Sequence, residues 1–151
     1  MKSLAVALAL ALVLTGAHAG AWGDGSFDND DAMDWVNDCV RATSPEVVKA
    51  AFDRVLSAEV VEAPDASAAI AAAEVVAASL GKPSPSIPAD LRAWLAGQRP
   101  AQVAAQAALA QRALTKIEDP KHSELRQLWS EGKANKWLTK VHALQSRIAI
   151  K

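Results

Sequence analysis

The stretch Asp65-Ala-Ser-Ala-Ala-Ile-Ala-Ala-Ala-Glu-Val-Val-Ala-Ala-Ser-Leu80 decides the fold of this chain. Alanine is the strongest helix former, Asp65 or Ser67 can cap the start of a helix, and Gly81 and Pro83 follow its end. The stretch is apolar on every side except for one carboxylate, and such a helix is normally buried at the centre of a bundle. We therefore predict an all-α protein: a single compact bundle around a buried, alanine-rich central helix.

Prolines, glycines and capping residues divide the rest of the chain into further helices. Strand signals are almost absent, because the chain has no tyrosine and few alternating β-branched runs. With the central helix, the bundle should hold about six or seven helices. The other predicted helices begin at Asp28, Ser44, Pro88, Pro100 and Ser123, and after Gly132. Asp28, Ser44 and Ser123 are the expected caps of their helices, and the helix from Pro100 should run to Pro120.

A secretory leader precedes this bundle. Lys2 supplies a positive start, residues 4–14 form an unbroken apolar run, and Ala17-His18-Ala19 matches a cleavage site. The run is too short to span a bilayer, which needs about 20 apolar residues. We therefore expect residues 1–19 to be a signal peptide and residues 20–151 to form a single exported all-α domain. It would be periplasmic or secreted and would make no membrane contact after cleavage.

The charges are distributed unevenly along the chain. Residues 20–80 carry 12 acidic and 3 basic side chains, whereas residues 81–151 carry 5 acidic and 12 basic ones. The basic residues are spread over several predicted helices, and no aromatic platform for single strands interleaves them. We therefore expect two complementary halves with solvated surfaces, and no nucleic-acid partner.

Two side chains near the first predicted helix are expected to be buried. Cys39 is the only cysteine, which excludes an intramolecular disulfide, and its helical spacing from Trp35 predicts a buried, inert thiol. Trp22 is preceded and followed by glycine-containing turns, which would let its ring pack back onto the helix.

The most distinctive stretch is Gly20-Ala-Trp-Gly-Asp-Gly-Ser-Phe-Asp-Asn-Asp-Asp-Ala-Met-Asp-Trp35, which resembles the opening motif of a bacterial family named domain of unknown function 4259. The similarity continues through the central helix and through Ser123-Glu-Leu-Arg-Gln-Leu-Trp129 to Trp137. The resemblance implies a shared fold, and it brings no activity with it. The motif residues singled out are Gly20, Trp22, Gly23, Gly25, Phe27, Asp28, Asn29, Asp30, Asp31, Trp35, Glu74, Glu124, Leu125 and Trp129.

The acidic cluster in this motif is a candidate metal site. Asp24, Ser26 and Asp28 have the spacing of the first three ligands of a calcium loop. Position six of that loop would be an asparagine in place of glycine, and position twelve a tryptophan in place of a bidentate glutamate. An irregular site across Asp24–Asp31 stays open, and the alternative is a helix N-terminus whose acids suit the helix dipole. We predict no bound metal.

Glu74 is the second candidate, because a carboxylate on an apolar helix is costly unless it is paired. We predict a structural ion pair with an arginine from the second half of the chain. The alternative is a general base with a raised pKa. The available partners are Arg92, Arg112, Arg126 and Arg147.

Other catalytic patterns are missing from the sequence. His122 and His142 lie twenty residues apart and form no zinc motif, and no nucleophile elbow, phosphate loop or dinucleotide fingerprint occurs. We therefore predict that the protein binds no cofactor. We expect a non-catalytic binding or interaction module, whose partner could be a protein. The alternative is an uncatalogued hydrolase or metal-assisted enzyme that uses Glu74 or the Asp24–Asp31 cluster.

Overall fold

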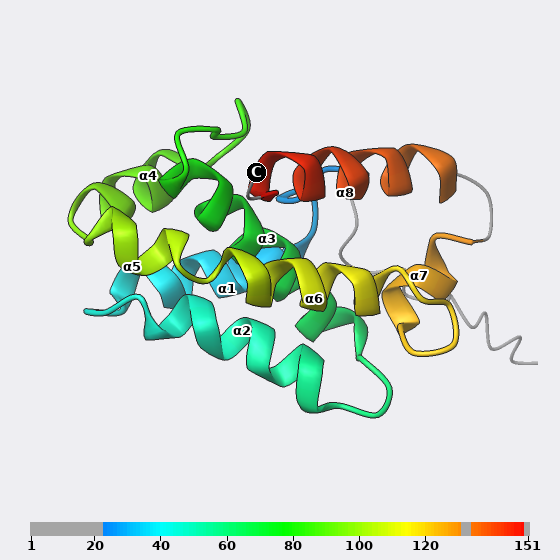
Figure 1. Ribbon diagram of the computed structural model, residues 1–151. Coiled ribbons are helices and arrows are strands. Elements are labelled where there is room, and N and C mark those ends of the chain that lie inside the picture. Colours follow the sequence, from blue (N-terminus) through cyan, green and yellow to red (C-terminus); the bar gives the residue numbers. More distant parts are fainter. Residues whose placement is uncertain (1–22, 131–133, 150–151) are drawn as a thin grey trace, which may run out of the picture.

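A computed structural model describes residues 23–130 and 134–149 of the chain (Figure 1). The predicted leader, Gly20 and Trp22 lie outside these residues. The described part contains eight helices and no β-strand, which confirms the all-α prediction. None of these helices has the length and apolar character needed to cross a membrane. The helices are α1 (Asp30–Arg41), α2 (Glu46–Ser57), α3 (Ala63–Ser79), α4 (Ala89–Ala96), α5 (Pro100–Ala104), α6 (Ala107–Ile117), α7 (Glu124–Leu128) and α8 (Ala134–Ile148).

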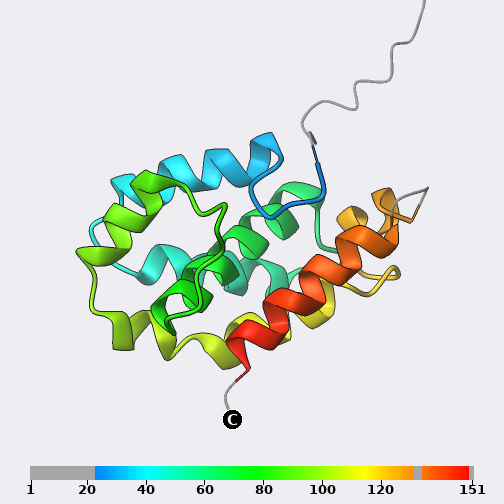
Figure 2. The ribbon, with the colours of Figure 1, turned by 90° about the horizontal axis from the view of Figure 1, so that it is seen from above.

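The alanine-rich helix α3 is the centre of the bundle, as predicted. Every residue from 66 to 77 is buried, and α3 packs against each of the other helices. Figures 1 and 2 show it running through the middle of the molecule, with α1 and α2 on one side and α8 above it. Small side chains let the neighbouring helices approach α3 closely from all directions. Because helices surround α3, none of its sides faces solvent, and a polar face would be buried.

The start of α3 differs from the prediction. The helix begins at Ala63, so Asp65 and Ser67 lie inside its first turns and neither is its cap. The backbone N–H of Ala63 instead donates to the Glu124 carboxylate at 3.1 Å, and that negative charge suits the positive end of the helix. The cap comes from a residue 61 positions away, which local sequence patterns do not reveal.

Two other predicted caps are also wrong. The cap of α1 is Asn29, whose side chain accepts the backbone N–H of the residue three positions on at 2.8 Å. Asp28 is not the cap because its carboxylate turns back to accept the Gly25 N–H at 3.0 Å. Pro45 occupies the N-cap position of α2, and no side chain caps this helix, so Ser44 is not its cap.

The helix predicted from Pro100 to Pro120 is broken into α5 and α6, which explains the additional helix. The break lies at Ala105 and Gln106, where the Gln106 side chain donates to the Pro45 carbonyl at 3.3 Å. Farther along α6, the Lys116 ammonium donates to the Ala58 carbonyl just after the end of α2. Both ends of α2 are therefore tied to this part of the chain, and a cation at a helix C-terminus is favourable.

The predicted burial of Cys39 is confirmed. Cys39 lies on the core face of α1 with Trp35, and burial raises the pKa of its thiol to about 12. The thiolate, which is the reactive form, is therefore scarce at neutral pH. The indole N–H of Trp35 is buried without a hydrogen-bond partner among the described residues.

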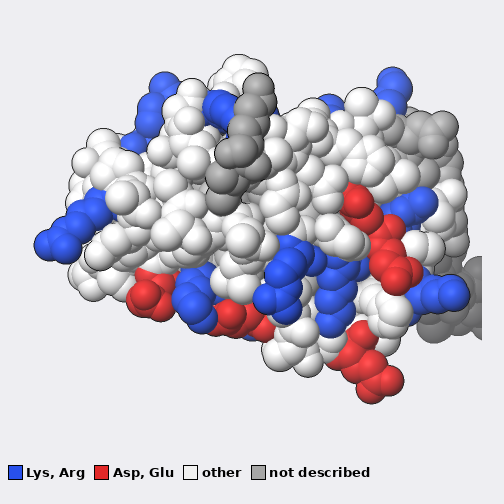
Figure 3. Space-filling view, in the orientation of Figure 1, with Lys and Arg blue, Asp and Glu red and all other residues white. Residues whose placement is uncertain are grey.

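Acidic and basic side chains are mixed on part of the surface. On the face in Figure 3, acidic and basic side chains are interspersed over α2 and α6. Pairs such as Lys49 with Asp53 on α2 contribute to this pattern. The uneven charge of the two halves therefore does not produce a field of one sign over these two helices, although only basic side chains are seen along the upper edge of this face (Figure 3).

The end of α3 provides a stability prediction. Gly81 has a φ of 77°, and a Cβ added to it would meet no atom within 4 Å. Gly81→Ala should therefore lower the free energy of unfolding by about 1–2 kcal/mol, the cost of a left-handed alanine. Gly97→Ala is the matched control, because Gly97 ends α4 with a φ of −83°. Urea denaturation measures both, and equal effects would contradict a purely conformational cost.

Candidate functional site

The glycine-rich segment 23–29, here called the N-loop, folds around the carboxylate of Asp28. Gly23 donates its N–H to the Asp28 carbonyl at 3.3 Å, and Gly25 donates to the Asp28 carboxylate. A Cβ on either glycine would lie 2.6 Å from Asp28 Oδ2. A side chain at either position would therefore displace the Asp28 carboxylate from its place in the N-loop, and neither residue has a positive φ.

The N-loop is held to the core by Glu74. The Ser26 hydroxyl donates to Glu74 Oε1 at 2.7 Å, and the two terminal nitrogens of Arg147 donate to the two carboxylate oxygens at 2.8 Å each. Glu74 is 2 % exposed. This two-pronged geometry is the strongest form of ion pair, and it confirms the predicted pairing with an arginine of the second half.

These contacts leave little of Glu74 for chemistry. Both of its oxygens accept hydrogen bonds, and the residue does not line the pocket described below. Arg147 also donates to the Lys82 carbonyl at 3.1 Å, so the pair joins the N-loop, α3, α8 and the segment after α3. The arrangement suits a structural hub and gives no support to a general base.

The acids of the opening motif point to different partners. Asp24 pairs with Lys140 of α8, whose hydrogen bond is the main reason that the pKa of Asp24 is lowered. Asp28 serves the N-loop, while Asp30 and Asp31 lie in the first turn of α1. Within residues 23–130 and 134–149, no three His, Cys, Asp or Glu side chains are grouped so as to hold a metal ion.

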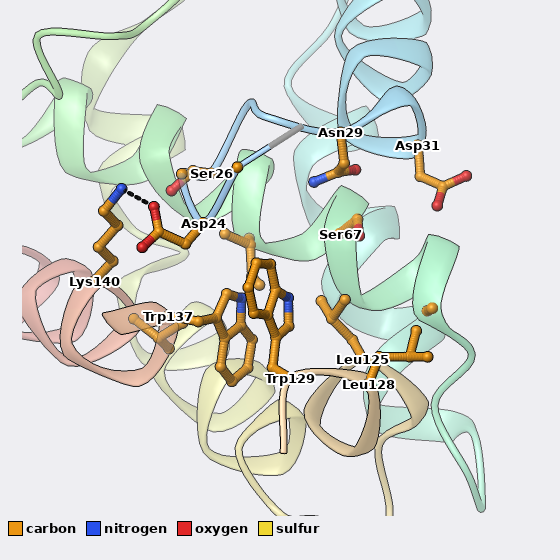
Figure 4. Close-up of a pocket in the computed structure, with 15 residues that line it drawn as sticks. Asp24, Ser26, Asn29, Asp31, Ser67, Leu125, Leu128, Trp129, Trp137 and Lys140 are labelled. Carbon is orange, nitrogen blue, oxygen red and sulfur yellow. Dashed lines mark hydrogen bonds and ion pairs between the residues drawn. The ribbon is translucent and has the colours of Figure 1, made fainter. Parts of the chain in front are cut away.

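A pocket of about 150 Å³ lies between the N-loop, the start of α3, α7 and α8 (Figure 4). Residues more than 100 positions apart in the sequence form its walls. The lining residues are Gly23, Asp24, Gly25, Ser26, Asn29, Asp31, Ala63, Ser67, Ile70, Leu125, Leu128, Trp129, Trp137, Lys140 and Val141.

Two stacked tryptophans form the aromatic wall of this pocket. The ring centroids of Trp129 and Trp137 are 6.4 Å apart, and their planes differ by 9°. Trp137 is buried, whereas Trp129 is half-buried, and Leu128 beside it is 59 % exposed. In Figure 4 the two rings stand below the N-loop, with Asp24 and Lys140 on one side and the two leucines on the other. The pocket is therefore apolar below and polar above.

Two polar side chains of the pocket have no partner among the described residues. Ser67 of α3 is 3 % exposed, and its hydroxyl makes no hydrogen bond there. The Asp31 carboxylate likewise has no ion-pair partner, and burial, then the nearby charges of Asp34 and Asp30, raise its pKa. The pocket thus offers a hydroxyl and a carboxylate that the fold itself does not use.

A short backbone pairing places α7 against the pocket. Val61 donates its N–H to the His122 carbonyl at 2.8 Å, and Glu124 donates its N–H to the Val61 carbonyl at 3.0 Å. The Glu124 side chain then caps α3, while the predicted capping of α7 by Ser123 is confirmed by a 3.2 Å bond to the Arg126 N–H. The start of α3 and the start of α7 are therefore held together.

The structure sorts the motif residues into two groups. Those that line the pocket are Gly23, Gly25, Asn29, Asp31, Leu125 and Trp129. Those that hold its walls in place, or lie in the core beside it, are Phe27, Asp28, Trp35, Glu74 and Glu124. Asp30 belongs to neither group and is exposed in the first turn of α1.

Sequence reasoning missed part of the site. It named Trp129 only as a motif residue, whereas Trp129 follows the end of α7 and lines the pocket. It also passed over Ser67 and Lys140. Ser67 carried the same signal as Glu74, a polar residue on an otherwise apolar helix, but it was read as a helix cap.

The fold and site define an all-α domain in which an N-terminal loop and the C-terminal helices enclose a small aromatic pocket. Residues 20–140 match the model of a family described as a domain of unknown function (DUF4259), and the chain belongs to this family. The matched region holds every residue that lines the pocket except Val141. No curated protein and no solved structure matches the chain.

The Glu74 ion pair generates a stability prediction. Glu74→Ala should lower the free energy of unfolding by about 3 kcal/mol or more, because it orphans the arginine and the serine hydroxyl. Arg147→Ala should cost about as much, since it leaves a buried carboxylate. The double variant Glu74→Leu, Arg147→Met should cost less than the two single losses combined. Thermal melts measure all three variants. A melting temperature lowered by less than about one or two degrees in Glu74→Ala would contradict the structural role of this ion pair.

The acidic cluster generates a prediction about metal. Calorimetry with calcium should show no micromolar binding, because Asp24 and Asp28 already have partners and the glycine and bidentate acid of a calcium loop are missing. Micromolar binding that disappears in Asp28→Ala and Asp30→Ala would overturn this prediction. Asp38→Ala is a matched control, since Asp38 is an exposed acid of α1 outside the cluster.

Proposed function

We propose that the protein is an exported, non-catalytic binding module that holds a side chain of a protein partner in the pocket between the N-loop, α7 and α8. The observation that carries this proposal is the pocket itself, with its aromatic wall and its unused polar groups. Export is supported by the leader pattern: Lys2, the apolar run 4–14 and the Ala-His-Ala site.

The size of the pocket favours one anchoring side chain over a cofactor. Pockets that take cofactors or drug-sized ligands usually measure about 300–1,000 Å³. A cavity near 150 Å³ holds a group about as large as benzene. The pocket, at about 150 Å³, is therefore matched to a single large side chain.

The rim of the pocket favours a protein over a free small molecule. Leu128 is exposed beside the half-buried Trp129, so apolar surface continues beyond the pocket mouth. A lone exposed leucine would be ordinary. Next to an aromatic-lined hollow, it resembles the surroundings of an interface hot spot, where a central anchor is ringed by apolar contacts.

The enzyme alternative has weaker support. Glu74 is hydrogen-bonded on both oxygens and lies outside the pocket lining, and Asp24 is paired with Lys140. Glu74 and Asp24, two of the acids that the alternative names, are therefore engaged in holding the fold together.

Photocrosslinking tests this proposal. A photoreactive phenylalanine derivative replaces Leu128 at the rim, and the same derivative replaces the exposed Arg112 of α6 as a matched control. Irradiation in the exported fraction should give one discrete protein adduct from position 128 and none from position 112. The adduct should re-form with the identified, purified partner and should fall at least tenfold in a folded Trp129→Ala background.

Equal labelling from both positions would contradict the proposed docking site, as would an adduct that is indifferent to Trp129→Ala. Circular dichroism of each variant establishes that the helices are intact.

A further inference from the structure

We infer that the side chain held in the pocket is cationic, an arginine of the partner, with Asp31 as its counter-ion and the Trp129 indole as the surface against which its methylene stem packs. This inference rests on the proposed function and deepens it by naming the chemistry of the anchor.

The charges of the pocket favour a cation. Two of its lining residues are acidic and one is basic, and Lys140 is already paired with Asp24. Asp31 is left without an ion-pair partner among the described residues. An arriving cation would find one free carboxylate, whereas an anion would meet repulsion from it.

Helix capping does not account for the state of Asp31. An acid in the first turn of a helix is normally stabilised by the helix dipole, which lowers its pKa. Burial and the neighbouring acids Asp34 and Asp30 instead raise the pKa of Asp31. Its ionised form is therefore unfavourable in the free protein, and a bound cation would relieve that cost.

The aromatic wall fits the stem of an arginine. In Figure 4 the Asp31 carboxylate lies across Ser67 from the Trp129 ring and points away from it, so one guanidinium does not meet both groups. The methylene stem packs against the indole, while the guanidinium lies at Ser67 and Asp31. Trp129 is packed flat against Trp137, so its ring is held in one orientation. A pre-organised ring of this kind costs little entropy on binding.

Ser67 supplies an independent indication of a ligand. The residue is 3 % exposed, lines the pocket and makes no hydrogen bond within the described chain. A ligand that fills the pocket covers this hydroxyl, which is costly unless the ligand offers it a partner, and a guanidinium carries five N–H donors. A purely apolar anchor would instead leave both Ser67 and Asp31 buried and unpartnered.

Blocked peptides that differ in one group test the inference. The probes are acetyl-Gly-Xaa-Leu-Gly-amide with Xaa as arginine, lysine, citrulline or norleucine, where citrulline matches arginine in shape but lacks its charge. The leucine is placed to meet Leu128. NMR titration follows the indole N–H signals of Trp129 and Trp137. The arginine peptide should bind at least tenfold more tightly than the citrulline peptide and should shift both signals.

Variants of two acids on α1 assign that preference. Asp31→Asn should reduce the ratio of arginine to citrulline affinity to about one, whereas Asp34→Asn, at an exposed position outside the pocket lining, should preserve it. Asp31→Asn should not unfold the protein, because it removes a charge that is unfavourable in the free state.

The outcomes separate this inference from the proposed function. Equal binding of arginine and citrulline peptides, or a preference that survives Asp31→Asn, would overturn the cationic anchor. Tighter binding of the norleucine peptide with the same indole shifts would also overturn it, yet would support a docking pocket for an apolar anchor. Absence of binding by every peptide would overturn the inference, and the crosslink at position 128 would then decide the proposed function separately.

Discussion

The buried carboxylate of Glu74 is the constraint on which the rest of this structure depends. Helix α3 is apolar on all other sides, and packing of small apolar side chains has little directionality. The bonds from Ser26 and Arg147 add direction, because they fix where the N-loop and the end of α8 meet α3. A buried ion pair often adds little net stability, so its main contribution here is to specify the position of both ends of the domain.

The pocket depends on these fixed positions of the N-loop and α8. Lys140 lies two helical turns before Arg147, so both project from the same side of α8. Lys140 pairs with Asp24 while Arg147 reaches the carboxylate that Ser26 also binds, and the N-loop is therefore joined to α8 at two points. On the other side, the Glu124 carboxylate holds α7 at the start of α3. The pocket is the space that these three attachments leave between the elements.

The sequence predicted features that depend on neighbours within a few residues or on a strong compositional contrast. The central helix, its Gly81 end and the capping of α7 by Ser123 are of this kind, and an acid isolated on an apolar helix required a basic partner. The predictions that failed concern residues whose partners lie far away in the sequence. Glu124 caps a distant helix, and Trp129 faces a pocket whose other walls come from elsewhere in the chain. Such roles are set by tertiary contacts, and no periodicity encodes them.

The comparison of Glu74 with Asp31 explains why the conspicuous acid is the weaker functional candidate. A buried carboxylate draws attention because burial is costly, but that cost obliges the fold to supply partners, and Ser26 and Arg147 do so. Asp31 is only partly buried, so the fold tolerates it without a partner, at the expense of a raised pKa. A ligand gains most from a group that the protein has left unsatisfied. The free carboxylate at the α1 side of the pocket is therefore the group with binding energy still to contribute.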